Sequence, residues 1–233
     1  MLNIVKGYIF IFLQGGLLGH FWYFAALGFL YALLPLLVKI VHSRSNINFL
    51  WFCTSIVCVT IQVVSYMKGY PIQRNFPQAL RVWTWVQYFL LGGVVSYNIE
   101  IVHKVSSKPI AKMILVILFV IIPVVEMNFG IKVLNVKYAE YFYDSFLDII
   151  WNFLIFSVCI SLNNVSAKCC ISKLALLTLG VYAIHFILLT VIHHMWTISS
   201  SIQAVVLFAL TSLISFTVTW MLYHSPISWF VKL

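Results

Sequence analysis

Charged side chains are scarce in this sequence. Only 8% of its 233 residues are Asp, Glu, Lys or Arg, whereas 63% are hydrophobic, and the mean hydropathy is +1.05. Soluble proteins carry roughly a quarter charged residues and about half apolar ones. The shortage of charge therefore excludes a water-soluble enzyme, a disordered chain and a nucleic-acid module. It indicates an integral membrane protein whose main partner is the lipid bilayer.

Acidic residues and paired cysteines are also few. The sequence has 5 acidic against 14 basic residues, a net charge of +9. The basic residues are spread singly and in pairs between apolar blocks, which is typical of loops beside anionic lipid headgroups and not of a nucleic-acid-binding face. The 5 cysteines form no C-x-x-C pair, so neither a disulfide framework nor a metal site is expected. The glycine-rich phosphate loop, the zinc helix and the nucleophile elbow are likewise missing from the sequence.

Long runs without charge predict the fold class. A spanning helix needs about 20 mostly apolar residues, and the uncharged runs leave room for about seven. We therefore expect an all-α, polytopic membrane helix bundle. The spans are predicted near residues 21–41, 47–66, 83–102, 110–127, 146–162, 173–195 and 202–223. Pro123 and Glu126 should kink the fourth of these spans or place its end at the interface.

The loop charges predict the orientation of the bundle. Eight Lys and Arg residues fall on one side of the membrane and six on the other, which places the C-terminus in the cytoplasm. With seven spans the N-terminal end is then outside, although residues 1–20 show no secretory signal pattern. We expect residues 1–20 to be an interfacial segment or a truncated helix, followed by the transmembrane bundle at 21–233.

A first cluster of polar and aromatic residues stands where a span begins. It comprises His20, Trp22 and Tyr23, and leads through Tyr31 to Pro35. His20, Tyr23 and Tyr31 are predicted to share roughly one helical face. Ionisable groups at membrane depth are costly and suggest function. An aromatic belt that anchors the headgroup level is the alternative.

A second cluster lies in the sixth predicted span. Thr178, Tyr182 and His185 are spaced four and three residues apart, so they share a helical face. A histidine near the middle of the bilayer is not expected to face lipid. It either takes part in substrate binding or proton transfer, or is a buried imidazole bonded to a neighbouring helix.

Other polar residues are weaker candidates. Arg74 and Arg81 could hold an anionic substrate group, but solvated loop residues are the simpler interpretation. Asp148, Trp151 and Asn152 could line a polar cavity, although a carboxylate reaching the interface is expected more often.

Both clusters resemble motifs of the acyltransferase 3 family, the bacterial inner-membrane O-acyltransferases. The stretch from His20 to Phe24, followed by Tyr31 and Pro35, looks like that family's "H-x-W-[FY]-[LF] … Y-x-x-x-P" helix. The stretch from Thr178 to His185 resembles its "[ST]-x-G-[IV]-Y-x-[IL]-H" helix. The segment that follows Trp85 is similar to the span between them, so the resemblance covers essentially the whole chain.

The resemblance implies a function. Family members are expected to have about ten helices and to move an acyl group, commonly acetyl from acetyl-CoA or another acyl-CoA, onto a sugar hydroxyl. The bacterial inner membrane is then the expected location, a cell-surface carbohydrate the acceptor, and no metal is required. The family's N-terminal Arg and His motif has no counterpart in this sequence. The resemblance therefore implies a form without the first three helices, truncated or inactive.

The resemblance also implies roles for individual residues. His20 and His185 are the predicted catalytic residues. The predicted substrate-binding residues are Trp22, Tyr23, Tyr31, Arg74, Thr178 and Tyr182. A non-catalytic polytopic membrane protein, or a transporter-like bundle for lipid-linked saccharides, is the alternative to an enzyme.

Overall fold

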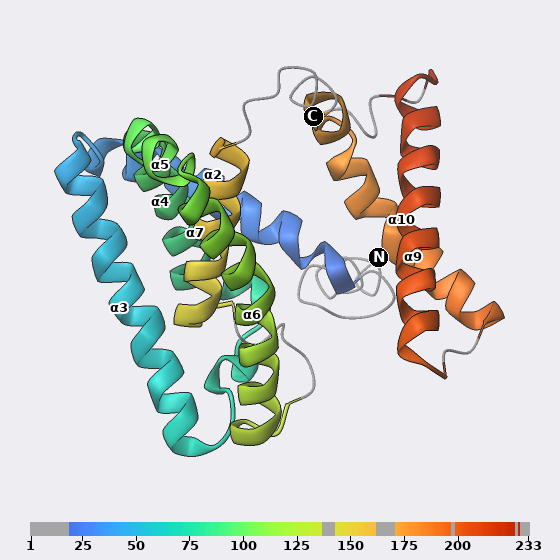
Figure 1. Ribbon diagram of the computed structural model, residues 1–233, viewed down its shortest axis with the longest axis horizontal. Helices are drawn as coiled ribbons and strands as arrows, with labels where there is room; N and C mark the ends of the chain where they lie inside the picture. The colour runs from blue at the N-terminus through green and yellow to red at the C-terminus, as the bar shows by residue number, and fades with distance from the viewer. Residues whose placement is uncertain (1–18, 137–142, 162–170, 197–198, 227, 229–233) are drawn as a thin grey trace, which may run out of the picture. The chain divides into compact units, whose positions relative to one another are not determined.

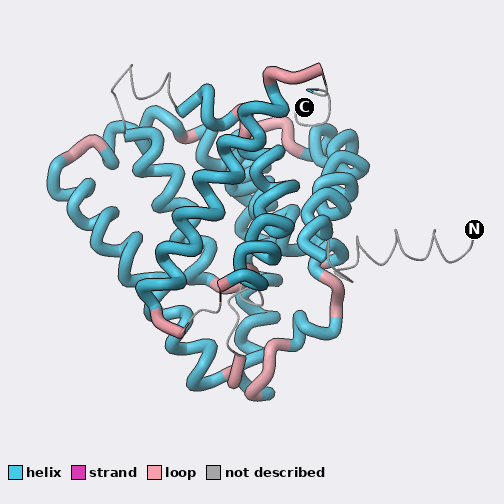
Figure 2. Tube along the Cα trace, turned by 90° about the vertical axis from the view of Figure 1, so that its right-hand side faces the viewer, coloured by secondary structure: helices cyan, strands magenta, loops and turns pink. Residues whose placement is uncertain are grey.

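The chain folds as helices joined by short connections. The computed structural model describes all residues except 1–18, 137–142, 162–170, 197–198, 227 and 229–233. Figure 2 shows helices and loops, and no strand, in the part of the chain that is described. The prediction of an all-α bundle is confirmed. The segment predicted at residues 1–20 lies outside the described residues, apart from Gly19 and His20.

Two compact units make up the chain. The described part of the first unit begins at Trp22 and ends at Ser161; that of the second comprises Gly19 to Phe21 and the residues from Ile171 onward. The first unit contains α2 (Trp22–Ile40), α3 (Arg44–Lys68), η2 (Ile72–Asn75), η3 (Gln78–Leu80), α4 (Val82–Tyr97), α5 (Ile99–Ser106), α6 (Pro109–Val133) and α7 (Phe146–Ser161). The second contains η1 (Gly19–Phe21), α9 (Thr178–Met195) and α10 (Ser201–Tyr223). Figure 1 labels α9 and α10.

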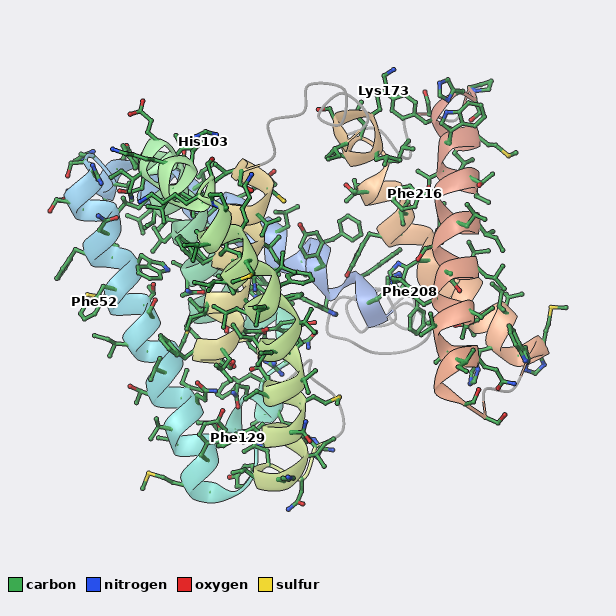
Figure 3. All side chains as sticks on the ribbon, in the orientation of Figure 1. Phe52, His103, Phe129, Lys173, Phe208 and Phe216 are labelled. Carbon is green, nitrogen blue, oxygen red and sulfur yellow. The ribbon has the colours of Figure 1, made fainter. Side chains whose placement is uncertain are left out.

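Five of the described helices are long and apolar enough to cross a membrane. They are α2, α3, α6, α9 and α10. Their outward side chains are apolar; Phe52 projects from α3 in Figure 3 and is 58% exposed. Apolar side chains exposed along whole helices indicate contact with lipid tails. The chain is therefore a polytopic membrane protein.

The two remaining predicted spans correspond to shorter helices. α7 is an apolar helix of 16 residues. α4 also has 16 residues, and the prediction of one span over 83–102 is wrong because α4 ends at Tyr97 and α5 begins at Ile99. The Asn98 side chain donates to the Val94 carbonyl at 2.6 Å and accepts from Arg44, which competes with a continuous helix. α6, in contrast, continues through Pro123 to Val133.

Sequence-local signals define the ends of α3. The Ser43 side chain accepts a hydrogen bond from the Asn46 N–H at 3.2 Å, a normal N-cap. Gly69 ends the helix with φ 68°, in the left-handed region that glycine tolerates best. Between these caps α3 has 25 residues, which at about 1.5 Å per residue is enough to cross the hydrocarbon core.

α4 lies at the centre of the first unit, in contact with α2, α3 and α7. Its buried side chains include Thr84 and Gln87 as well as Leu90 and Leu91. A helix packed on several sides by protein does not have to present an apolar surface to lipid. This position explains how α4 accommodates the buried polar side chains of Thr84 and Gln87.

Candidate active site

A histidine cluster occupies the second unit. His20 lies in η1, and its ring centroid is 5.5 Å from that of His185 and 5.7 Å from that of Tyr182, both on α9. The His20 ring also stacks on Phe186 at 4.9 Å. The structure therefore brings together three of the residues that the sequence selected, although 162 positions separate His20 from Tyr182.

Tyr182 attaches η1 to α9. Its hydroxyl donates a hydrogen bond to the backbone carbonyl of His20. Tyr182 and His185 are three residues apart on α9, so their side chains project from neighbouring positions of one helical face. Tyr182 thus holds the backbone of His20 in place, and His185, one turn further along α9, supplies a second imidazole beside it.

The hydrogen bonds of His185 determine its tautomer. Its Nδ1 lies 2.6 Å from the Tyr182 carbonyl oxygen and 3.2 Å from the Val181 carbonyl oxygen. Carbonyl oxygens only accept, so Nδ1 carries a proton. In the neutral ring Nε2 then keeps its lone pair and can accept a proton or a hydrogen bond.

His20 is held in its neutral form. Neither ring nitrogen makes a hydrogen bond of normal geometry to the described residues, and both are buried. Burial lowers the pKa of His20 below its ordinary value of 6.5, and the neighbouring His185 lowers it further, while the Ala183 backbone partly opposes this. A buried, neutral imidazole is the state that a general base requires at pH 7.

A cavity of about 440 Å³ lies between α9 and α10, beside this cluster. Half of its ten lining residues are apolar, and the other half, Thr178, Tyr182, His185, Thr211 and Ser212, carry polar groups on side chains that also present apolar surface. The Thr211 hydroxyl is buried and has no hydrogen-bond partner among the described residues. Buried hydroxyl groups are normally bonded, so this one is available as a donor to a bound molecule.

Two other predicted site residues lie in the first unit. Trp22 stacks on Trp85, with ring centroids 5.0 Å apart and planes at 26°. Tyr23 and Trp85 both line a second cavity, of about 460 Å³. His20 belongs to the 3-10 turn η1, which runs directly into α2, where Tyr23 and Tyr31 lie. That these three residues share a helical face stays a prediction.

The remaining predicted site residues lie at exposed positions. Tyr31 is 64% exposed on α2, and Arg74 is exposed in η2. Neither residue lines either of the two cavities. Thr178 begins α9, lines the 440 Å³ cavity and donates to the Ala175 carbonyl at 2.7 Å.

Arg81, interpreted from sequence as a solvated loop residue, is buried. Its Nε and one terminal nitrogen donate to the Phe76 carbonyl at 3.2 and 3.1 Å. It lies close enough to Asp144 to act on that carboxyl electrostatically. The side chain therefore has a structural role in the loop that precedes α4.

Sequence reasoning also missed a buried polar network in the first unit. Gln73 donates to Asp144 at 2.8 Å, and Ser145 donates to Glu126. Burial raises the pKa of Asp144, while the hydrogen bond from Gln73 and the charge of Arg81 oppose the rise. Gln73 and Asp144 are 71 positions apart, so nothing in a single sequence indicates that they are in contact. Glu126 and Asp148 could be recognised as unusual only because a carboxyl group is energetically costly within an apolar span.

No arrangement for a metal ion occurs in the described ranges: no group of three or more His, Cys, Asp and Glu residues is placed to bind one. The cluster in the second unit instead has the parts for proton transfer. It combines a buried neutral imidazole, a second imidazole of defined tautomer and a largely apolar cavity with an unbonded hydroxyl.

Comparisons with known proteins place this geometry in a family. A family model described as an acyltransferase domain matches residues 2–224. Neither a curated protein nor a solved structure matches the chain significantly. The match covers nearly the whole sequence and agrees with the resemblance carried by the His20 and His185 motifs. The chain belongs to the acyltransferase 3 family of membrane acyltransferases.

Proposed function

We propose that this protein transfers an acyl group, commonly acetyl, from acyl-CoA to a hydroxyl of a cell-surface carbohydrate. The family supplies the acyltransferase activity. The finer assignment is supported by one observation above all. His20 is half-buried with both ring nitrogens shielded, its pKa is lowered, and its ring lies 5.5 Å from a second imidazole that lines a cavity.

The chemistry needs a base, a donor and a dry site. In the proposed reaction a ring nitrogen of His20 takes the proton of the acceptor hydroxyl while the hydroxyl oxygen attacks the thioester carbonyl carbon. The tetrahedral intermediate collapses by breaking the carbon–sulfur bond. The proton held by His20 then passes to the departing thiolate, so the products are an ester and free CoA thiol.

The cavity between α9 and α10 suits the acyl end of the donor. Its lining is mostly apolar, as an acyl chain requires, and it has about 440 Å³ of space. The Thr211 hydroxyl would donate to the oxygen on which negative charge develops. His185 and Tyr182 would keep His20 in position, and Thr178 stands at the start of α9 in the same lining.

The acceptor residues are part of the same proposal. Trp22 and Tyr23 would shape the acceptor site together with Trp85. The Trp22 ring stacks on Trp85, and Tyr23 and Trp85 both line the 460 Å³ cavity. The exposed position of Arg74 in η2 suits contact with a long acceptor outside that cavity. Tyr31 lies midway along the spanning helix α2, so its role in substrate binding stays a prediction that its position does not support. The proposed location is the bacterial inner membrane, with the C-terminus in the cytoplasm.

A genetic experiment tests the proposal. Surface polysaccharides from cells with and without the gene are compared by mass spectrometry. A difference of one acyl group per repeating unit, restored by the wild-type gene and not by His20→Ala, is the expected result. His194→Ala is the control, because His194 is an exposed histidine near the end of α9, the helix that carries His185.

The same experiment distinguishes the competing function. A transporter for lipid-linked saccharides would change the amount of surface polysaccharide without changing its acylation. Unchanged acylation after gene loss, with reduced polysaccharide, would therefore replace the acyltransferase assignment by transport.

A further inference from the structure

The 460 Å³ cavity of the first unit has an unusual lining for a membrane protein. Seven of its twelve lining residues are aromatic, and three of these are tyrosines. Asp148 and Asn152, one turn apart on α7, add a carboxylate and an amide. We propose that this cavity binds a pyranose ring of the carbohydrate acceptor, an inference that rests on the proposed function.

The chemistry of the lining favours a sugar. The faces of a pyranose ring carry C–H groups that pack on indole and phenol rings, while its hydroxyls need donors and acceptors at the edge. Trp85 and Trp151 supply the apolar faces. The Asn152 amide donates one N–H to the Asp148 carbonyl at 2.9 Å, which leaves its oxygen and its second N–H for a ligand.

The aromatic platforms are fixed before any ligand arrives. The Trp85 Nε1 donates to the Gln78 carbonyl at 2.7 Å, and the Trp22 ring stacks on Trp85. The Trp151 Nε1 donates to the Phe119 carbonyl at 3.0 Å, and the two rings stack at 5.4 Å. Rings that are already ordered lose little conformational entropy on binding, which favours affinity.

Another cavity of the first unit is almost entirely apolar and provides a comparison, because its lining suits a hydrocarbon chain. It has about 360 Å³ and is lined by aliphatic side chains, one phenylalanine and the two serines Ser106 and Ser157. It contains no charged side chain. The contrast argues against a lipid tail as the occupant of the aromatic cavity, since a carboxylate and an amide would lose hydrogen bonds beside a hydrocarbon chain.

The position of the cavity suits a water-soluble acceptor. Tyr23, Trp85 and Asp148 stand in the first turns of α2, α4 and α7. If α2, α3, α4 and α6 cross the bilayer in turn, the order of the elements makes α2, α4 and α7 begin at one membrane face. η3, in the loop before α4, contacts α2. A sugar could therefore enter from the headgroup region without crossing the hydrocarbon core.

Asn152 provides the sharper test, because Asp148 also has a structural role. The Asp148 backbone N–H donates to the Ser145 hydroxyl at 3.0 Å, and its carboxyl bonds to Glu126. Asn128 on α6 is a matched control for Asn152. Its amide makes the same bond, to the carbonyl four residues earlier, at 2.8 Å, and it does not line the cavity.

Binding is measured on the full chain in phospholipid nanodiscs by saturation-transfer NMR. The probes are methyl glycosides of a hexose, an N-acetylhexosamine and a 6-deoxyhexose, with myristate as the apolar competitor. We expect at least one glycoside to bind, and Asn152→Leu to weaken that binding about ten-fold, the effect of one lost hydrogen bond. Asn128→Leu should bind as the wild type does. Binding of no glycoside, equal binding by both variants, or displacement of the glycoside by myristate would each overturn the proposal.

Release of CoA from acetyl-CoA without sugar separates this inference from the proposed function. That reaction uses water as the acceptor and depends on His20, so Asn152→Leu should leave it within two-fold of the wild-type rate. Loss of glycoside binding together with intact CoA release supports the acceptor site. If Asn152→Leu abolishes CoA release as well, the acceptor site is overturned, because the residue then acts on the chemistry. If His20→Ala releases CoA normally, the proposed function fails while the glycoside site stands.

Discussion

At the scale of single residues, protonation decides whether His20 can act. Its imidazole packs against Phe186 and His185, and both burial of the ring and the neighbouring His185 disfavour a positive charge. Because the pKa of His20 is lowered, the folded protein keeps this ring neutral at pH values where a free histidine is already half protonated. The ring of His185, the second imidazole, is held in place because its Nδ1 donates a hydrogen bond to the backbone carbonyl of Tyr182.

The pH dependence of transfer follows from this lowered pKa. As the pH falls, activity should stay constant through 6.5, the ordinary pKa of histidine, and decline only below it, when His20 becomes protonated. The measurement is kcat/KM for acyl transfer between pH 4.5 and 8. An acid limb with a midpoint at or above 6.5 would contradict a buried His20 as the base.

The individual residues also show how far one sequence can be interpreted. The spacing of Tyr182 and His185 correctly predicted neighbouring side chains on one helix. Tyr31 does not join Tyr23 at the 460 Å³ cavity but is 64% exposed on α2, because the packing of neighbouring helices, which one sequence does not report, decides which positions are covered. The burial of Arg81 and Asp144 depends on contacts between distant segments, which no local pattern reports.

At the scale of elements, close packing between α3 and α4 organises the first unit. These two helices are in extensive contact, and Gly93 of α4 faces Ile47 of α3. A Cβ atom added at Gly93 would lie 2.2 Å from Ile47 Cδ1, far inside van der Waals contact. A Cβ added at the adjacent Gly92 would have open space around it. Substitutions at Gly92 and Gly93 therefore distinguish the effect of helix propensity, which both share, from the effect of packing, which arises only at Gly93.

Alanine at the two glycines should have opposite effects. Gly92→Ala is expected to stabilise the protein by about 0.5–1 kcal/mol through helix propensity. Gly93→Ala should lose that gain and destabilise by roughly 1 kcal/mol, since Ile47 must leave its position. Thermal unfolding of both variants in the same detergent is the measurement. Equal melting temperatures for the two variants would show that α3 and α4 are not in such close contact.

The lengths of the elements explain which spans the sequence predicted well. α3 has a serine N-cap and a glycine C-cap, so its boundaries agree with the predicted 47–66 to within a few residues. The predicted span at 83–102 failed because hydropathy does not detect the break at Asn98, which depends on side-chain bonds to Val94 and Arg44. Apolar content thus predicts that a helix exists more reliably than where it ends.

At the scale of the whole molecule, composition and motifs together carried the interpretation furthest. The hydrophobic fraction established a membrane protein, and the motifs around His20 and His185 resembled the family that the domain match identifies. The division into two compact units could not be predicted, because it depends on which helices contact one another and not on composition.

The orientation of the molecule in the membrane is the whole-molecule prediction. With the C-terminus in the cytoplasm, the loop that contains Asn75 faces outward and the start of α3 at Ser45 faces inward. Each position is replaced by cysteine after the 5 native cysteines are removed. A membrane-impermeant maleimide should label Asn75→Cys in intact cells and Ser45→Cys only after lysis. The reverse pattern would invert the topology.

The proposed reaction is measured most directly as transfer of radiolabelled acetyl from acetyl-CoA by the purified chain in phospholipid nanodiscs, with surface polysaccharide as the acceptor. We expect labelled polysaccharide for the wild type and for His194→Ala. His20→Ala should lose about 10²–10⁴-fold, the size of a general-base contribution. Equal labelling by wild type and His20→Ala would contradict His20 as the base.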